Sequence, residues 1–95
     1  MAGYVIVNNE VTDEALYAEF RELASASIEA HGGRYLVRGG AAEVMEGGWT
    51  PDRLVVVEFD SVEQARAWLT SAQFAEARKI RVKAAGASVI VVEGV

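Results

Sequence analysis

Hydrophobic and polar residues alternate along the chain with periods that change several times, and each change marks a new element. Residues 4–8 are rich in β-branched and aromatic residues, which predicts a strand. A helical period follows, and Thr12 or Asp13 can cap its start while Glu14 places negative charge at its positive end. The helix should end at Gly32, because glycine readily adopts the left-handed conformation that closes a helix. Its predicted buried face carries Leu16, Tyr17, Phe20, Leu23, Ala24, Ser27 and Ile28.

Two glycine pairs bracket the second predicted strand, residues 34–38. Glycines inside a strand pattern are typical of a bulge or a bend, so we expect a kink at Gly39 and Gly40 and a continuation through residues 42–45. After a turn, residues 54–59 are almost continuously apolar. Such a run predicts a strand that is central in its sheet or covered on both faces.

The last third of the chain predicts more helix and a closing strand. Ser61, with a glutamine three residues later, is typical of a capping box. We expect the helix that it opens to break near Ser71 and a further helical segment to cover residues 74–84. A turn at residues 85–87 should then lead into a final strand at residues 88–93.

The resulting order, β-α-β-β-α-β, predicts an α+β protein of ferredoxin-like architecture. That architecture is one four-stranded antiparallel sheet with the helices on one face, and residues 1–95 fit a single domain of this kind. Alternating residues of a strand point to opposite faces, so Arg34 and Arg38 should share one face. With them we place Leu36, Leu54, Val56 and Glu58, whereas Tyr35, Val37, Val55, Val57 and Phe59 should lie under the helices.

The face away from the helices is too apolar to meet open water. Large apolar patches on small proteins mark interaction surfaces, and a second copy of the same sheet is the most economical cover. We therefore predict a homodimer in which the two sheets pack face to face.

Composition narrows the range of functions. The net charge of -5 argues against nucleic-acid binding, which depends on phosphate contacts. With no cysteine and one histidine, we expect neither a bound metal nor a cofactor. No apolar run is long enough for a membrane span, and no secretory pattern is evident, so we expect a cytoplasmic protein. The basic cluster Arg78, Lys79, Arg81 and Lys83 is interpreted as a solvated helix face, with an anion-attracting rim as the alternative.

Arg34, Arg38 and Glu58 are the first candidates for chemistry, since the hairpin of the second and third strands should bring them together. A carboxylate beside guanidinium groups is most simply an ion pair. Two positive charges against one negative charge nevertheless leave one arginine available for a ligand carboxylate or enolate. His31 is the natural general acid or base, and Glu58 is a second catalytic candidate. The alternative for His31 is a cap at the end of its helix.

Two further side chains are candidates for ligand binding. Trp68 can line an aromatic pocket, although aromatic residues at helical spacing also belong in cores. Asn8 ends the first strand where a barrel mouth should lie, and its alternative interpretation is a turn-forming residue.

Several short motifs, taken together, resemble the family catalogued as domain of unknown function 1330, within the superfamily of dimeric α/β barrels. They are residues 31–35 (HGGRY), residues 49–53 (WTPDR) leading into residues 57–59 (VEF), Ser61 with Ala65, Trp68, Ser71 and Phe74, and residues 92–94 (VEG). The resemblance implies a ferredoxin-like subunit that pairs through its sheet and encloses a cleft between sheet and helices. It implies no particular activity.

These observations favour a homodimer that binds a small anionic or carbonyl-containing organic molecule beside Arg34, Arg38, Glu58 and His31. If the protein is an enzyme, these residues are suited to cofactor-independent proton transfer with arginine stabilising the developing negative charge. The alternative is a non-enzymatic homodimer, a binding or stress-response module whose polar residues pair with one another.

Overall fold

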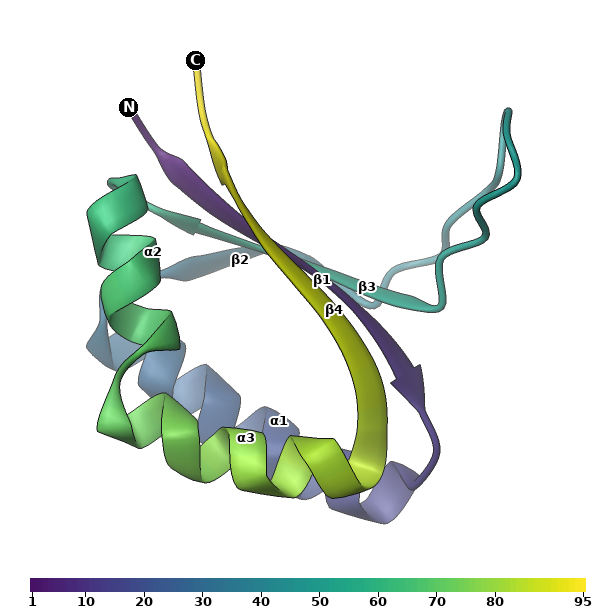
Figure 1. Ribbon diagram of the computed structural model, residues 1–95, viewed down its shortest axis with the longest axis horizontal. Helices are drawn as coiled ribbons and strands as arrows, with labels where there is room; N and C mark the ends of the chain where they lie inside the picture. Colours follow the sequence, from purple (N-terminus) through teal and green to yellow (C-terminus); the bar gives the residue numbers. More distant parts are fainter.

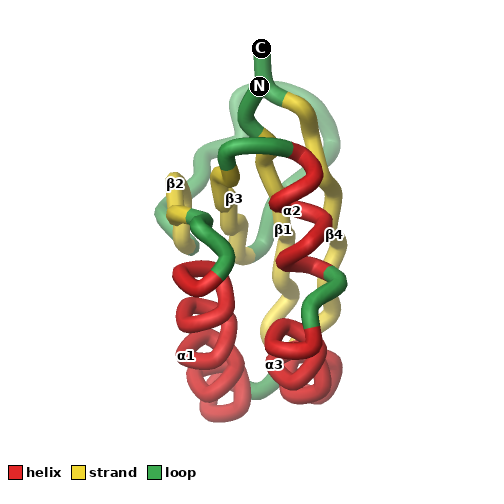
Figure 2. Tube along the Cα trace, turned by 90° about the vertical axis from the view of Figure 1, so that its left-hand side faces the viewer, coloured by secondary structure: helices red, strands yellow, loops and turns green.

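The computed structural model describes residues 1–95 and consists of one antiparallel sheet with helices packed on one face (Figures 1 and 2). The four strands lie in the order β2-β3-β1-β4, which confirms the predicted α+β, ferredoxin-like arrangement. No helix has the length and apolar character needed to cross a membrane. In chain order the elements are β1 (Gly3–Val11), α1 (Glu14–Ala30), β2 (Arg34–Arg38), β3 (Arg53–Phe59), α2 (Val62–Leu69), α3 (Ala72–Ala84) and β4 (Ala85–Glu93).

Local sequence signals set the helix ends. The side chains of Asp13, Ser61 and Ser71 each accept a hydrogen bond of 3.1 Å from the backbone N–H three residues further on. These bonds satisfy amide groups that lack a partner inside the helix, so each side chain fixes the first turn. Gly32 has a φ of 76°, and this left-handed conformation ends α1 as predicted.

The hydrophobic core lies between the sheet and the helices. Every second residue of β1 and β3 faces it, while α1 contributes the stripe around Ala24. Leu23 was predicted to belong to that stripe but is exposed, because it lies roughly 90° around the helix from the centre of the buried face. The core residues are Val5, Val7, Tyr17, Phe20, Ala24, Ile28, Val57, Phe59, Ala65, Trp68, Phe74, Ala77, Ala84 and Ala85.

The sheet face turned away from the helices, called the outer face below, is largely apolar. In the strand register, residues of β1 on this face pair with residues of β3 on one side and β4 on the other. No helix covers them, and Ile90 and Val92 are exposed. The apolar residues of the outer face include Tyr4, Ile6, Leu54, Val56, Ile90 and Val92.

One extra residue interrupts the alternation of β2. Arg34 and Tyr35 pair with Glu58 and Val57, but the register then shifts, and Arg38 pairs with Val55. Leu36 is the inserted residue of this β-bulge. The prediction that Arg34 and Arg38 share a face is therefore wrong, because an odd number of extra residues reverses the facing of everything after it. Val37, predicted to lie under the helices, correspondingly pairs with Val56 of the outer face.

The predicted continuation of this strand through residues 42–45 is also wrong. Gly39 has a φ of 71°, and its backbone N–H donates to the Leu54 carbonyl over 2.8 Å. This conformation turns the chain out of the sheet. Residues 39–52, called the arm below, then project away from the body of the molecule (Figure 1).

The predicted turn at residues 85–87 does not form either, because α3 runs directly into β4. Ala85 is already extended, with φ -161° and ψ 149°, and it pairs with Val11 at the end of β1. The Ala84 carbonyl accepts hydrogen bonds from the backbone N–H groups of Thr12 and Asp13, which ties the two strand ends together. Pairing with β1 thus makes residues 85–87 part of a strand, although their local sequence predicted a turn.

Gly33 provides a test of how tightly α1 and the sheet approach each other. A Cβ at this position would lie 2.6 Å from the Phe59 ring and 2.8 Å from Ile28 Cγ2. We expect Gly33→Ala to lower the free energy of unfolding by about 1–3 kcal/mol, as overpacking does. Gly40→Ala is the control, since a Cβ there has no atom within 4 Å. Urea unfolding of both variants measures the difference, and equal stability would contradict this packing.

Candidate functional site

A small cavity lies between the sheet and the helices. Its volume is about 40 Å³, which is room for roughly three water molecules. Most of its wall is apolar, and five aromatic rings contribute to it. The lining residues are Val7, Asn9, Tyr17, Phe20, Arg21, Ala24, Ile28, Tyr35, Arg38, Val55, Val57, Trp68, Leu69, Phe74, Arg81 and Val89.

All charged residues of the cavity wall are arginines. They are Arg21 from α1, Arg38 from the end of β2 and Arg81 from α3, and no aspartate or glutamate lines the cavity. This local excess of positive charge contrasts with the net charge of -5 of the whole chain. The cavity is therefore an electropositive site in an acidic protein.

Arg81 is the least compensated of these arginines. Its Nε is buried and has no hydrogen-bond partner, while its guanidinium carbon lies 5.9 Å from the centre of the Phe74 ring. Burial, together with the neighbouring positive charge of Arg78, lowers the pKa of the Arg81 guanidinium. Arg78 itself donates to the Leu69 carbonyl over 2.8 Å. Arg81 as a whole is partly buried, but a buried nitrogen without a partner is costly, and an anion beside it would relieve that cost.

Asn9 and Tyr17 form a buried polar pair on the same cavity wall. Asn9 Nδ2 donates to the Tyr17 hydroxyl oxygen over 3.0 Å, and both residues are about 2% exposed. Asn9 Oδ1 has no partner. Burial raises the pKa of the Tyr17 phenol, so the ring carries a neutral hydroxyl at physiological pH. Because its oxygen already accepts from Asn9, the hydroxyl proton is free to be donated.

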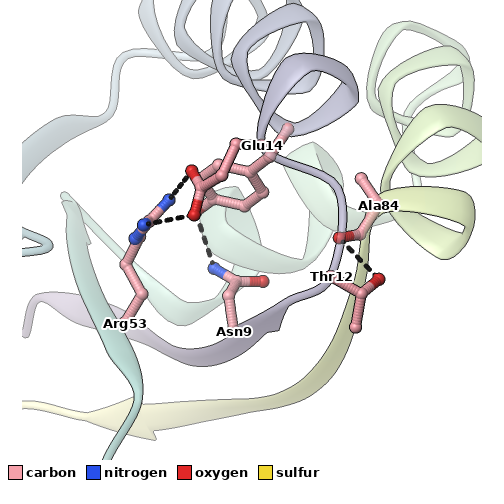
Figure 3. A network of polar contacts seen from close by, with 6 residues as sticks. Asn9, Thr12, Glu14, Arg53 and Ala84 are labelled. Atoms are coloured by element: carbon pink, nitrogen blue, oxygen red, sulfur yellow. Dashed lines mark hydrogen bonds and ion pairs between the residues drawn. The ribbon is translucent and has the colours of Figure 1, made fainter.

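An ion pair covers the other side of Tyr17. Arg53 Nη1 and Nη2 donate to the two carboxylate oxygens of Glu14 over 3.3 and 3.2 Å (Figure 3). The Arg53 guanidinium carbon lies 4.9 Å from the centre of the Tyr17 ring. Hydrogen bonding to Glu14 raises the pKa of Arg53. Arg53 is therefore matched by an acid, unlike Arg81, and it braces the ring of Tyr17.

The structure separates the arginines that the sequence grouped together. Arg34 lies on the outer face, where its Nε donates to Glu58 Oε1 over 2.7 Å and its Nη2 lies 3.5 Å from Asp60. Arg38 lies on the helix side, with its guanidinium carbon 5.0 Å from the centre of the Tyr35 ring. The simple ion-pair interpretation therefore holds for Arg34 and Glu58, while Arg38 alone reaches the cavity.

His31 and Asn8 do not line the cavity. His31 Nδ1 lies 2.8 Å from the Ser27 carbonyl at the end of α1, which agrees with the helix-cap interpretation. Asn8 Nδ2 donates to Asp52 Oδ2 over 3.1 Å, and Asn8 Oδ1 accepts from the Asp52 backbone N–H over 2.8 Å. Asn8 thus fastens the base of the arm to β1.

Trp68 belongs both to the core and to the cavity wall. It is 3% exposed, and its ring centre lies 4.4 Å from that of Phe74 and 5.5 Å from that of Phe59. Its Nε1 donates to Ser27 Oγ over 2.8 Å, so the polar atom of the indole is satisfied inside the protein. The two interpretations considered for Trp68 are compatible.

The sequence suggested Tyr17 for an aromatic pocket and Arg81 for an anion-attracting rim, and both line the cavity. It did not single out Asn9 as a binding residue or show that these three side chains share one cavity. The position of Asn9 could have been predicted from the sequence. Val5 and Val7 are buried, and alternate residues of a strand share a face, so residue 9 of β1 lies on the same buried face. Arg81 lies seven residues after Phe74, at a spacing that returns to the same helix face. No group of histidine, aspartate and glutamate side chains is arranged to hold a metal ion.

Comparisons with known proteins place the chain among small ferredoxin-like proteins. The family model described as "Domain of unknown function (DUF1330)" matches residues 2–95. No curated protein matches the chain.

Solved structures provide further matches. A protein of unknown function from Rhodopseudomonas palustris is 17% identical with a TM-score of 0.80, and the match covers 99% of this chain and 82% of that one. A dimeric, ferredoxin-like protein of unknown function from Bacteroides fragilis is 16% identical with a TM-score of 0.66, covering 98% and 96%. Another, from Jannaschia sp., is 16% identical with a TM-score of 0.67, covering 99% and 100%. At these identities the matches establish the fold.

Proposed function

This chain belongs to the family described as Domain of unknown function (DUF1330), and from its cavity we propose that the protein binds a small organic anion between its sheet and helices. The single observation that carries the proposal is the unpaired, buried Nε of Arg81. The apolar wall would enclose the carbon skeleton of the ligand, while the guanidinium would bind its carboxylate or a comparable negative group.

The surrounding charges support an anion over a neutral or cationic ligand. Arg21 and Arg38 line the same cavity, and no acid does. Arg53 and Arg34, by contrast, are each paired with a carboxylate of the protein. The chain thus neutralises the arginines around the site and leaves those within it available.

We further propose that the protein acts as a homodimer that pairs through its outer face. Ile90 and Val92 are 55% and 40% exposed on that face, which is a large apolar exposure for so small a chain. The relatives from Bacteroides fragilis and Jannaschia sp. are described as dimeric. Face-to-face packing would leave the cavity of each subunit on the helix side of its own sheet.

The proposed binding of an anion does not depend on His31 or Glu58. Neither residue lines the cavity, and each already has a partner within the chain. The proposed binding site therefore assigns no acid–base role to these two residues. Tyr17 lines the cavity, and because burial raises its pKa it presents a neutral hydroxyl there.

Replacing Arg81 by glutamine tests the proposal. We expect propionate, which is small enough for the cavity, to bind the native protein and to bind Arg81→Gln at least about tenfold more weakly, because one charge-assisted contact is lost. Isothermal titration calorimetry measures the dissociation constants. Lys79→Gln is the matched control, because Lys79 lies on the same helix, is exposed and pairs only with Glu76.

The same variant should be at least as stable as the native protein in the absence of ligand. Arg81 is partly buried, and replacing it removes a charge whose Nε is desolvated without a partner, a cost that a binding site tolerates for its function. Urea unfolding without added anion measures this. A large loss of stability in Arg81→Gln, together with unchanged anion binding, would mean that Arg81 has a structural role and would overturn the proposal.

A further inference from the structure

Besides Nε of Arg81, the cavity wall holds an acceptor that lacks a partner and a hydroxyl group that accepts one hydrogen bond and can still donate another. The acceptor is Oδ1 of Asn9, a residue that is 2% exposed. The donor is the hydroxyl proton of Tyr17, whose oxygen lies 3.0 Å from Asn9 Nδ2. Both residues line the same cavity as Arg81. Buried polar atoms are usually hydrogen-bonded, so this combination calls for a complementary partner.

A simple carboxylate does not complement all three groups. It can accept from Arg81 Nε and from the Tyr17 hydroxyl, but it has no proton to give to Asn9 Oδ1. An ammonium group could donate to Asn9, but it would bring a second cation into a cavity whose charged residues are all arginines. A hydroxyl group can donate one hydrogen bond and accept another without carrying charge.

We propose that the ligand is a small hydroxy acid whose carboxylate lies against Arg81 and whose hydroxyl donates to Asn9 Oδ1 and accepts from Tyr17. This inference rests on the proposed anion site and adds the second functional group that the site recognises. The bond from Asn9 Nδ2 to the Tyr17 oxygen orients both side chains for that contact. Arg53, which is bonded to Glu14, lies over the Tyr17 ring and restrains it further.

This geometry should make the site prefer hydroxy acids over acids that lack the hydroxyl. Buried polar groups left unpaired make a site reject analogues that lack the matching hydroxyl. An acid without a hydroxyl would leave Asn9 Oδ1 unpaired after the cavity has lost its water. A keto acid would fail in the same way, because its carbonyl oxygen accepts but cannot donate.

The experiment compares matched acids by isothermal titration calorimetry with the whole chain. Lactate, propionate and pyruvate share a three-carbon skeleton that is small enough for the cavity. We expect lactate to bind the native protein at least about tenfold more tightly than propionate or pyruvate, because each of these two leaves one buried acceptor unsatisfied. Asn9→Leu, similar in size, should bind the hydroxy acid and its unhydroxylated counterpart equally.

Two further variants keep the test decisive if Asn9→Leu does not fold. Tyr17→Phe removes only the hydroxyl and should reduce the preference for lactate over propionate. Asn8→Ala is the matched control, since Asn8 is the same residue type at the next position but does not line the cavity. It should keep the full preference.

The outcomes separate this inference from the function on which it rests. If lactate and propionate bind the native protein equally, and both are lost in Arg81→Gln, the hydroxy-acid assignment is overturned while the anion site stands. Equal binding is also the result expected if a resident water already satisfies Asn9. If no acid binds, both proposals fail. A preference that survives in both Asn9→Leu and Tyr17→Phe would overturn the assignment to this pair.

Discussion

Val56→Asp should separate the proposed dimer into monomers. Val56 lies in the outer face with Ile6 of β1 on one side and Val37 of β2 on the other. Two sheets packed face to face would bury the new carboxylate, and the two-fold symmetry would bury a second copy of it. A buried, unpaired charge costs several kcal/mol, so we expect dimer dissociation to be favoured by at least about a thousandfold.

Light scattering after size-exclusion chromatography, over a dilution series, measures this change in mass. Val82→Asp is the control, because Val82 is 66% exposed on α3, on the other side of the sheet. It should keep the mass of the native protein. A Val56→Asp protein that still elutes with the mass of a dimer would show that the outer face is not the contact between subunits.

Trp68→Ala should bring the largest loss of stability of any single variant considered for this chain. The indole packs against Phe59 and Phe74 and is 3% exposed, so alanine would leave a cavity in the centre of the core. Truncations of buried tryptophan typically cost about 3–5 kcal/mol, a large share of the roughly 5–15 kcal/mol that holds a domain together. Urea unfolding followed by circular dichroism measures the change.

Two matched variants separate burial from hydrogen bonding at this position. Trp68→Phe keeps an aromatic ring and loses the bond to Ser27, so its cost should be clearly smaller than that of Trp68→Ala. Trp49→Ala removes the other tryptophan, which is 61% exposed in the arm. Its effect on the unfolding of the subunit should stay within about 0.5 kcal/mol. Similar losses in Trp68→Ala and Trp49→Ala would contradict the description of Trp68 as a core residue.

Much of the fold was predictable because it depends on local signals. Caps at Asp13 and Ser61 and the glycine that ends α1 act within one helical turn, and the sequence shows them directly. The order of elements follows from the same signals, and it restricts the fold to a few topologies. The start of β4 was mispredicted because Ala85 is extended through its pairing with Val11, a contact between distant parts of the chain.

The site was less predictable because it depends on which way each side chain faces. Arg38 was placed on the outer face by counting alternate residues, and the bulge at Leu36 changes that count. Asn8 was predicted as a ligand-binding residue, but its neighbour Asn9 is the one that lines the cavity. Arg81 resembles its neighbours Lys79 and Lys83 in sequence, and only the packing of α3 turns it inward.

The bulge at Leu36 also has a consequence for how this chain is aligned with its relatives. A deletion of that one codon would restore regular alternation and carry Arg38 to the opposite side of the sheet. At 16–17% identity, the position of a gap in this strand is easily misplaced by one residue. The residue of a relative that corresponds to Arg38 is therefore better identified by superposing the two structures than by aligning the two sequences.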